Sequence, residues 1–450
     1  MGHFRKSLIL VFILFIFSFI LADTSYAIFN PLETKNNYFG IHIADTTDLA
    51  DAAKLVNSSG GDWGYITFVI RNDERDTKRW QEVFDNARRL HLIPIVRVAT
   101  RFENGNWEKP NLDEIDGWVS FLSSLNWVIK NRYLVLGNEP NHAAEWGGEI
   151  NPSEYAKYLS IFSQRLKKES EDFFILPAGF DASAPNSKIS MEESLFLRKM
   201  LETDPGVFAN IDGWTSHSYP NPGFSGFENA YGKGTVRTYE WELNYLKNLG
   251  VAKELPIFIT ETGWIHELDK ENKVNTSIVK IGQKLQYSFT NVWNDKRIVA
   301  VTPFLLSYYD VPFDVFSWKD KNGKFYEFYN QIQSIPKTKG EPVQITRGQI
   351  EMAFVPTIVR LNKNFKGFIL AKNIGQSIWE PGMIIANIYS GDNLVLENTQ
   401  NNFIEPKQIG ILTFDVINNH PVGINVFSVA LFLHNKDISN QIFLPQLVLP

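Results

Sequence analysis

Two glutamates in this chain each follow a short apolar segment that is typical of a buried strand. Glu139, in the motif Asn138-Glu139-Pro140, follows residues 133–136, and Glu261 follows residues 257–260. An unpaired buried charge is costly, so a carboxylate in such a position needs either a partner or a function. If both strands belong to one barrel, the two carboxyl groups could flank a glycosidic bond, and a separation of about 5–5.5 Å would suit hydrolysis with retention. The alternative is that each glutamate closes a structural ion pair.

From about residue 36 to 336 the sequence alternates between strand-like and helix-like segments. Eight apolar runs, rich in Val, Ile and Phe, predict strands at residues 38–43, 65–70, 93–98, 133–136, 173–177, 211–216, 257–260 and 298–306. Amphipathic spacing predicts helices at residues 47–56, 76–90, 112–125, 151–168, 191–201, 239–249, 275–293 and 324–332. Eight such units predict an α/β fold, a (β/α)8 TIM barrel over residues 36–336.

The pattern changes after about residue 337. A linker of polar residues, Gly and Pro is followed by short alternating segments separated by Asn, Asp and Gly. Strands are predicted at residues 354–361, 367–372, 383–389, 411–416 and 426–433. We expect a small C-terminal all-β domain over residues 343–450, an immunoglobulin-like sandwich in outline.

In a (β/α)8 barrel the active site lies at the carboxyl ends of the strands. His217 and Tyr219, at the end of the sixth predicted strand, share a face because they are two residues apart. Polar and aromatic residues at or just beyond the other strand ends are His42, Arg71, Arg97, Asn138, Trp264 and Tyr309. No His and acid spacing matches a recognised metal motif, so we predict neither a metal nor a cofactor.

Three motifs together resemble glycoside hydrolase clan A, whose retaining enzymes include the cellulase-like family 5. They are Gly137-Asn138-Glu139-Pro140, His217-Ser218-Tyr219 and Thr260-Glu261-Thr262-Gly263-Trp264, on predicted strands four, six and seven. The resemblance implies that Glu139 is the general acid/base and Glu261 the nucleophile. It also implies that Asn138 binds the sugar 2-hydroxyl.

The same resemblance implies roles for residues around the nucleophile. Tyr219 would donate its phenol to Glu261, and His217 would line the same subsite. Arg71 is expected to hold Glu261 ionised, with Arg97 as the competing candidate. Further sugar contacts are expected from Trp264, His42 and Tyr309; Tyr309 lies near the position where many clan members carry Trp.

The amino-acid composition limits the kinds of partner and chemistry that this protein can have. The 450 residues carry a net charge of −6 without a basic block, which argues against a nucleic-acid partner. There is no Cys, which excludes disulfides, thiol catalysis and Cys-ligated zinc.

Residues 1–27 have the features of an export signal. Arg5 and Lys6 precede an apolar run over residues 8–22, and Ser25-Tyr26-Ala27 supplies small residues for cleavage. An uncleaved anchor, with membrane or cell-surface association, is the alternative. In both cases we expect an extracellular or surface location.

We therefore expect a secreted retaining O-glycoside hydrolase that cleaves a β-linked polysaccharide or oligosaccharide by double displacement. The alternative is an extracellular glycan-binding or surface protein that uses the same barrel without catalysis. Sugar identity, linkage and endo or exo action depend on loop shapes and stay open.

Overall fold

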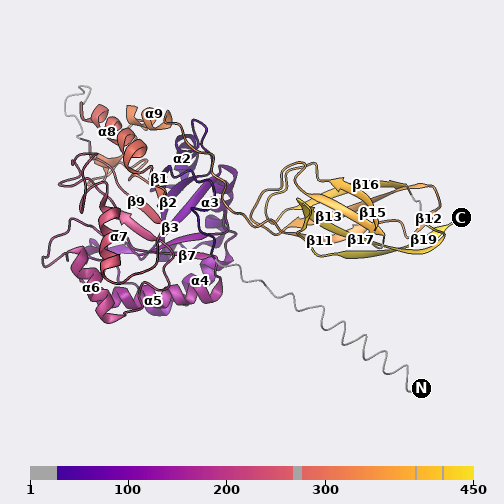
Figure 1. Cartoon of the computed structure of the whole chain (residues 1–450), viewed down its shortest axis with the longest axis horizontal. Coiled ribbons are helices and arrows are strands. Elements are labelled where there is room, and N and C mark those ends of the chain that lie inside the picture. Colours follow the sequence, from indigo (N-terminus) through magenta and orange to yellow (C-terminus); the bar gives the residue numbers. More distant parts are fainter. Residues whose placement is uncertain (1–27, 267–275, 391–392, 418–419) are drawn as a thin grey trace, which may run out of the picture.

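A computed structural model describes residues 28–266, 276–390, 393–417 and 420–450 (Figure 1). The expected export signal, residues 1–27, lies outside the described residues. In the described part of the chain, no helix is both long and apolar enough to cross a membrane.

The described N-terminal part forms a parallel barrel. Its strands pair in the orders β1-β2-β3-β6-β7 and β10-β9-β8. Isolated parallel bridges close both seams, Phe39 with Val301 and Asp181 with His217. The strands are β1 (Gly40–His42), β2 (Gly64–Arg71), β3 (Leu92–Ala99), β6 (Arg132–Leu136), β7 (Phe173–Pro177), β8 (Trp214–His217), β9 (Ile257–Glu261) and β10 (Ile298–Val301). The barrel predicted from the apolar runs is therefore confirmed.

Helices surround this barrel, and their ends follow the capping residues in the sequence. Asp76 accepts hydrogen bonds from the backbone of Lys78 and Arg79 at the start of α3, and Asn151 caps α5, which begins with Pro152. The helices are α2 (Leu49–Val56), α3 (Thr77–Arg89), α4 (Ile115–Ser124), α5 (Pro152–Glu169), α6 (Glu193–Thr203), α7 (Thr238–Asn248), α8 (Thr276–Tyr287) and α9 (Glu327–Gln333). Short helical turns lie at Thr46–Asp48, Asn72–Glu74, Leu112–Glu114, Ala143–Glu145, Ser288–Val292 and Asp314–Phe316.

The barrel interior is apolar at one end and polar at the other. Tyr133, Phe174 and Phe258 pack together near the amino ends of the strands, with ring centroids 5.0 to 5.6 Å apart. Closer to the carboxyl ends of the strands, the hydroxyls of Thr67 and Thr302 share a hydrogen bond of 2.8 Å inside the barrel. The polar layer above them contains the predicted site.

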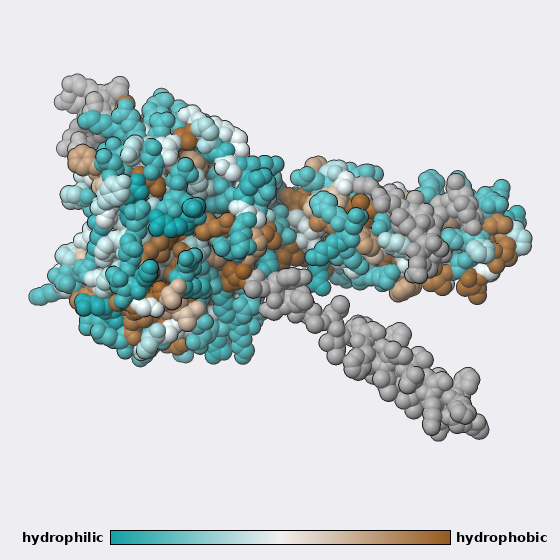
Figure 2. Space-filling view, in the orientation of Figure 1, coloured by the Kyte–Doolittle hydropathy of each residue, from teal (hydrophilic) through white to brown (hydrophobic). Residues whose placement is uncertain are grey.

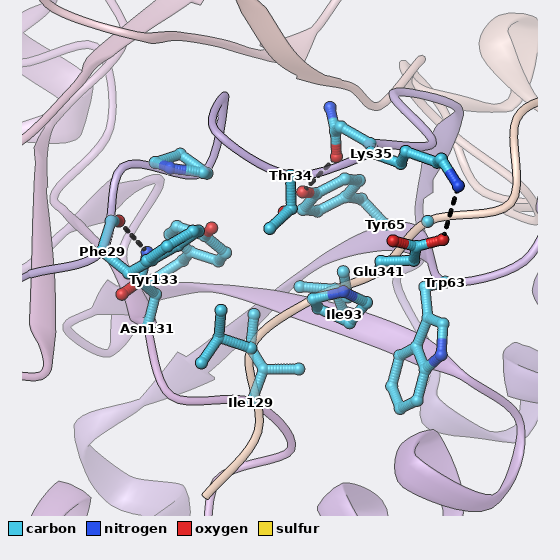
Figure 3. Close-up of a pocket in the computed structure, with 15 residues that line it drawn as sticks. Phe29, Thr34, Lys35, Trp63, Tyr65, Ile93, Ile129, Asn131, Tyr133 and Glu341 are labelled. Atoms are coloured by element: carbon cyan, nitrogen blue, oxygen red, sulfur yellow. Dashed lines mark hydrogen bonds and ion pairs between the residues drawn. The ribbon is translucent and has the colours of Figure 1, made fainter.

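A pocket at the amino end of the strands is closed by the segment before β1 and by the linker after α9 (Figure 3). The Tyr65 hydroxyl donates to Asn36, the Asn131 amide donates to the Phe29 carbonyl, and Lys35 pairs with Glu341. Because active sites of such barrels lie at the opposite end, we interpret this pocket as structural.

The C-terminal part forms two further sheets around a separate core. The first contains β11 (Gly348–Phe354), β13 (Asn364–Asn373) and β16 (Ile409–Ile417). The second contains β12 (Ile358–Arg360), β14 (Ile385–Ser390), β15 (Asn393–Thr399), β17 (Gly423–Leu433), β18 (Lys436–Asp437) and β19 (Ile442–Leu449). Trp379, Ile369 and Phe427 are buried between them. The prediction of a single strand over residues 354–361 is wrong. The chain forms two strands there, separated at Pro356, because proline has no N–H to donate to a β-ladder.

The two-sheet domain lies beside the barrel, and Figure 1 shows the C-terminus at its far end. Arg89 on α3 makes a two-pronged ion pair with Glu405, at 2.7 and 2.6 Å. The Gln376 amide donates to the Ile129 carbonyl, and the Asn126 amide donates to the Gly375 carbonyl, both at 2.8 Å. Apolar side chains also gather on the surface of this domain away from the barrel (Figure 2).

Candidate active site

Glu139 lies just beyond β6 in a strained backbone conformation. Its φ is +32°, and Gly137, two residues earlier, has φ +100°. A non-glycine residue at positive φ is uncommon and costs free energy, so the surrounding structure must hold it there. The Glu139 N–H donates to the Gly179 carbonyl at 2.9 Å, and its own carbonyl accepts from His142 N–H at 2.8 Å. These bonds fix the direction of the Glu139 side chain.

Glu261 ends β9, and His217 ends the neighbouring strand β8. A register shift between Ser216 and His217 pairs His217 directly with Glu261. Gly179, at the end of β7, leaves room for the imidazole, because a Cβ there would lie 2.2 Å from a carbon of the His217 ring. The ends of three adjacent strands therefore bring these side chains together.

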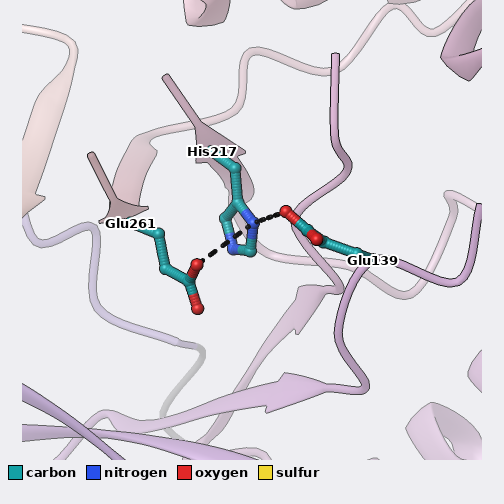
Figure 4. A group of neighbouring side chains, drawn as sticks. All are labelled: Glu139, His217 and Glu261. Carbon is teal, nitrogen blue, oxygen red and sulfur yellow. Dashed lines mark hydrogen bonds and ion pairs between the residues drawn. The ribbon is translucent and has the colours of Figure 1, made fainter. Parts of the chain in front are cut away.

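The histidine lies between the two glutamates (Figure 4). His217 Nδ1 is 2.8 Å from Glu139 Oε1 and 3.7 Å from Glu261 Oε2. A carboxyl oxygen of Glu139 lies within 4.8 Å of one of Glu261. Sequence reasoning predicted that these residues share one site, and the structure places them in contact.

Glu261 is also bound by a cation and a phenol. Arg97 Nη1 donates to Glu261 Oε1 at 3.2 Å, and the Tyr219 hydroxyl donates to Oε2 at 3.1 Å. Burial alone would raise the pKa of Glu261, but the positive charges of His217 and Arg97 outweigh it and lower that pKa. Glu261 is thus held as a carboxylate.

The charge of His217 follows from the same contacts. Burial alone would lower its pKa, but the charge of Glu261 and the hydrogen bond and charge of Glu139 raise the pKa of His217 to about 9. At neutral pH the imidazole therefore carries a proton that it can share with Glu139.

The arginine contact expected from Arg71 is made by Arg97 instead. Arg71 turns outward and pairs with Asp73 and Glu74, both at 3.2 Å. Arg97 points inward from β3, where it also donates to Asn138 Oδ1 at 2.6 Å. A signal for this existed in the sequence: Arg71 has acidic residues two and three positions away, whereas Arg97 interrupts an apolar run without a local partner.

Asn138 and Tyr219 lie where the motifs predicted, in contact with Arg97 and Glu261 respectively. His42 is buried beneath the site with its ring edge-on to Phe304, and burial lowers the pKa of His42 to about 4. His42 is therefore neutral at neutral pH.

The two aromatic residues predicted to contact sugar lie in different surroundings. Trp264 is only 4% exposed, and its indole N–H donates to the Gly226 carbonyl at 2.8 Å. This is a packing position rather than the sugar contact that we expected. Tyr309 is 45% exposed in the loop after β10 and stays a candidate sugar contact.

Two residues that were not selected from the sequence border the same site. Glu145 and Trp107 line a small pocket together with Arg97 and Asn138. Burial raises the pKa of Glu145 to about 7. The Arg97 guanidinium carbon lies 6.0 Å from the centre of the Trp107 ring. Glu145 ends the short helical turn Ala143–Glu145, a segment of mixed composition, so its local sequence offered no signal.

Glu139, His217 and Glu261 each offer one ligand atom, and the three atoms lie within 4.8 Å of one another, close enough to surround a cation. A divalent ion there would meet the positive charge of Arg97, which is 3.2 Å from Glu261. The arrangement suits a shared proton better than a metal, and a metal-free site stays our prediction.

Comparison with known proteins found likenesses among solved structures only. No family model matches the chain, and no curated protein matches it. The chain is similar to a GH128 endo-beta-1,3-glucanase from Sorangium cellulosum, at 14% identity and TM-score 0.43, covering 67% of this chain and 98% of that one. It is also similar to a GH5_18 structure from Bifidobacterium longum subsp. infantis, at 12% identity and TM-score 0.46, covering 73% and 84%.

A third similar structure is a modular endo-beta-1,4-mannanase of glycoside hydrolase family 26 from Cellulomonas fimi, at 10% identity and TM-score 0.41, covering 92% and 94% of the two chains. The solved structures to which this chain is similar thus include glycoside hydrolases, as the motifs predicted. Likenesses this distant say nothing of the reaction of this chain, which we infer from the site alone.

Proposed function

We propose that this protein is a retaining glycoside hydrolase acting on a β-linked polysaccharide or oligosaccharide. One observation carries the proposal: two glutamates from different strands lie with carboxyl oxygens within 4.8 Å of each other in distinct surroundings. This spacing agrees with the separation of about 5–5.5 Å in retaining enzymes and is shorter than the roughly 6.5–9.5 Å that admits a water molecule in inverting enzymes.

In the first step, Glu261 would attack the anomeric carbon while Glu139 protonates the departing glycosidic oxygen. Glu261 suits the nucleophile because Arg97 and His217 lower its pKa and keep it ionised. Glu139 suits the acid because its hydrogen bond to protonated His217 supplies a proton at the required place. The bond to the leaving group breaks as the ester to Glu261 forms.

In the second step, Glu139 would take a proton from water, which attacks the same carbon and releases Glu261. Esterification removes the negative charge of Glu261, which is the largest influence raising the pKa of His217. The His217–Glu139 pair has by then given its shared proton to the leaving group, and the lower pKa of His217 disfavours taking another proton from solvent. We infer that this helps Glu139 to be free as a base when water arrives.

Export through residues 1–27 is proposed from their sequence pattern alone. We propose that the domain over residues 343–450 is an immunoglobulin-like accessory module. Its exposed apolar side chains include the aliphatic Ile411 and Ile424, which are 63% and 80% exposed, and the aromatic Phe403 and Phe443, which are 66% and 63% exposed.

The test is hydrolysis of a panel of β-glucans, xylans, mannans and galactans by the protein with and without substitutions at the two glutamates. Glu139→Gln and Glu261→Gln should each lower kcat by at least about 10³-fold. Glu351→Gln, at an exposed position on β11, should not change it. The anomeric form of the first product, followed by NMR, should match that of the bond cleaved.

Products of opposite configuration would contradict a retaining mechanism. If no glycan in the panel is cleaved, pull-down of the same glycans tests the alternative that the barrel binds them without catalysis.

A further inference from the structure

A second histidine–carboxylate pair lies at the mouth of the barrel, next to the proposed acid/base. His142 Nε2 is 2.8 Å from Asp181 Oδ2, and each side chain is 30% exposed. His142 follows β6 and Asp181 follows β7, so the pair joins the loops of two adjacent strands. Neither residue contacts Glu261 or takes part in the proposed reaction.

The pair is rigidly connected to Glu139. The His142 N–H donates to the Glu139 carbonyl at 2.8 Å. Asn141 is fully buried, and its amide donates to the Asp181 carbonyl at 2.9 Å while its oxygen accepts from the Asp181 N–H at 3.3 Å. The Ser183 N–H donates to Asp181 Oδ1 at 2.8 Å. Asn141 already ties the two loops together, so the exposed pair is not needed for that purpose.

The pair lies on the Glu139 side of the site. The hydrogen bond that His142 donates to Asp181 raises the pKa of His142, with a further contribution from the charge of Glu139. Burial alone would raise the pKa of Asp181, but the hydrogen bond of His142 lowers it, helped by the charge of His217. Glu261 and Arg97 bind each other on the other side, where the sugar attacked by the nucleophile must lie.

In a retaining hydrolase the acid/base reaches the oxygen of the leaving group. Groups beside the acid/base and away from the nucleophile therefore face the leaving group. With Nε2 directed to Asp181, His142 has Nδ1 for another partner, and a raised pKa favours the form in which both nitrogens donate.

We propose that His142 and Asp181 form a binding subsite for a saccharide leaving group, with His142 Nδ1 donating to a hydroxyl of that sugar. This inference rests on the proposed function. It specifies the substrate as a glycan with a sugar on both sides of the bond cleaved, rather than a glycoside of a small non-sugar alcohol. Asp181 would hold the imidazole in the orientation and charge state that bind the hydroxyl.

The experiment compares two substrates that share the sugar attacked by Glu261: an oligosaccharide from the panel and the corresponding 2,4-dinitrophenyl glycoside. In His142→Ala, kcat/KM for the oligosaccharide should fall about tenfold or more beyond any fall for the aryl glycoside, because a charged hydrogen bond to the leaving sugar is lost. Sugar acceptors should also capture the glycosyl-enzyme less often. His142→Gln, which keeps a donor, should recover part of the loss.

The chain offers a matched control. His91 forms a similar pair with Asp62, at 2.8 Å and partly exposed, just before β3 at the other end of the barrel. His91→Ala should not change the ratio of the two activities. Thermal unfolding of each variant shows whether it is folded.

Equal losses of His142→Ala on both substrates, or no loss on the oligosaccharide, would overturn the subsite while leaving the proposed hydrolase intact. If the unaltered protein cleaves neither substrate, the proposed function fails and the subsite with it.

Discussion

At the residue scale, the charge of the site is set by one arginine that points into the barrel. Arg97 binds both Asn138 and Glu261, so it joins the two strand ends that carry the proposed catalytic groups. Arg71, two strands from β6, is satisfied by neighbouring acidic residues and is 38% exposed. A buried ion pair that loses one partner leaves an uncompensated charge, whereas an exposed pair contributes little.

Removal of Arg97 should therefore disable the site, and removal of Arg71 should not. Arg97→Ala should lower kcat/KM by about 10²-fold or more, since Glu261 loses a charged hydrogen bond and becomes harder to ionise. Arg71→Ala should stay within about threefold of the unaltered protein, because its pairs are exposed. Steady-state kinetics on the cleaved glycan measures both. Equal losses of kcat/KM in the two variants would show that Arg71 also acts in the site.

The protonation of His217 should determine the alkaline limit of activity. The reaction needs Glu261 ionised and a proton on the His217–Glu139 pair. The pKa of Glu261 is lowered, and the pKa of His217 is raised to about 9. We expect kcat/KM to be constant through neutral pH, to fall on the acid side below the ordinary range of Glu, and to fall on the alkaline side near pH 9.

A pH profile of kcat/KM tests this expectation, with His217→Asn as the informative variant. Asparagine cannot hold the shared proton, so the alkaline limb should move to lower pH and the maximal rate should fall. If the alkaline fall in kcat/KM stays near pH 9 in this variant, a group other than His217 causes that fall.

At the element scale, β8 is supported from behind by two buried carboxyl groups. Glu193 on α6 and Glu242 on α7 are both fully buried. Burial raises the pKa of Glu242 to about 7, and burial together with the charge of Glu242 raises the pKa of Glu193. The helix α7 packs against the strand that carries His217, and Glu193 on α6 meets Glu242 there. These acids are therefore protonated in the folded protein at mildly acidic pH.

Stability should consequently fall as pH rises. A raised folded-state pKa means that the folded protein holds a proton that the unfolded chain, with an ordinary value of 4.5, releases. The stability present below pH 4.5 is lost as pH rises to about 7, by on the order of 2–4 kcal/mol for Glu242.

Glu242→Gln cannot ionise, so its stability should depend less on pH between 4.5 and 8. Urea unfolding across this range measures the difference. Glu254→Gln, at an exposed position before β9, is the control and should keep the pH dependence of the unaltered protein. If the free energy of unfolding of Glu242→Gln changes with pH as steeply as that of the unaltered protein, Glu193 and Glu242 are not the cause of the pH dependence.

At the scale of the whole molecule, the two-sheet domain contributes to the outer surface of the barrel. The carbonyls of Val128 and Ile129 accept hydrogen bonds from Gln344 and Gln376, both at 2.8 Å. Val128 and Ile129 are themselves buried. The barrel therefore relies on the second domain to cover this segment between α4 and β6.

Removal of residues 343–450 should lower the Tm of the barrel by roughly 5 °C or more, since it exposes apolar side chains and removes several hydrogen bonds. Calorimetry should show one cooperative transition in the whole protein. Arg89→Ala, which removes only the exposed ion pair with Glu405, should cause a much smaller change. Two separate transitions, with the barrel transition unchanged by truncation, would contradict this coupling.

The amino-acid sequence by itself determined the alternating elements, the eight strands and the two glutamates at strand ends. These features depend on burial pattern and on residues close together in the chain, such as the run before Glu261 and the cap Asn151 before Pro152. Most strand ends were predictable to within one residue because apolar runs stop where the chain leaves the barrel, but the predicted eighth strand, residues 298–306, extends past β10, which ends at Val301.

Only the tertiary structure decided which side chains meet. Arg97 and Glu261 are 164 positions apart, and their contact depends on the closure and stagger of the barrel rather than on any local pattern. The same holds for the burial of Trp264 beneath Gly226 and for the pairing of His142 with Asp181. Local sequence indicates which strand ends are polar, but the choice among neighbouring charges is made by distances that arise after the barrel closes.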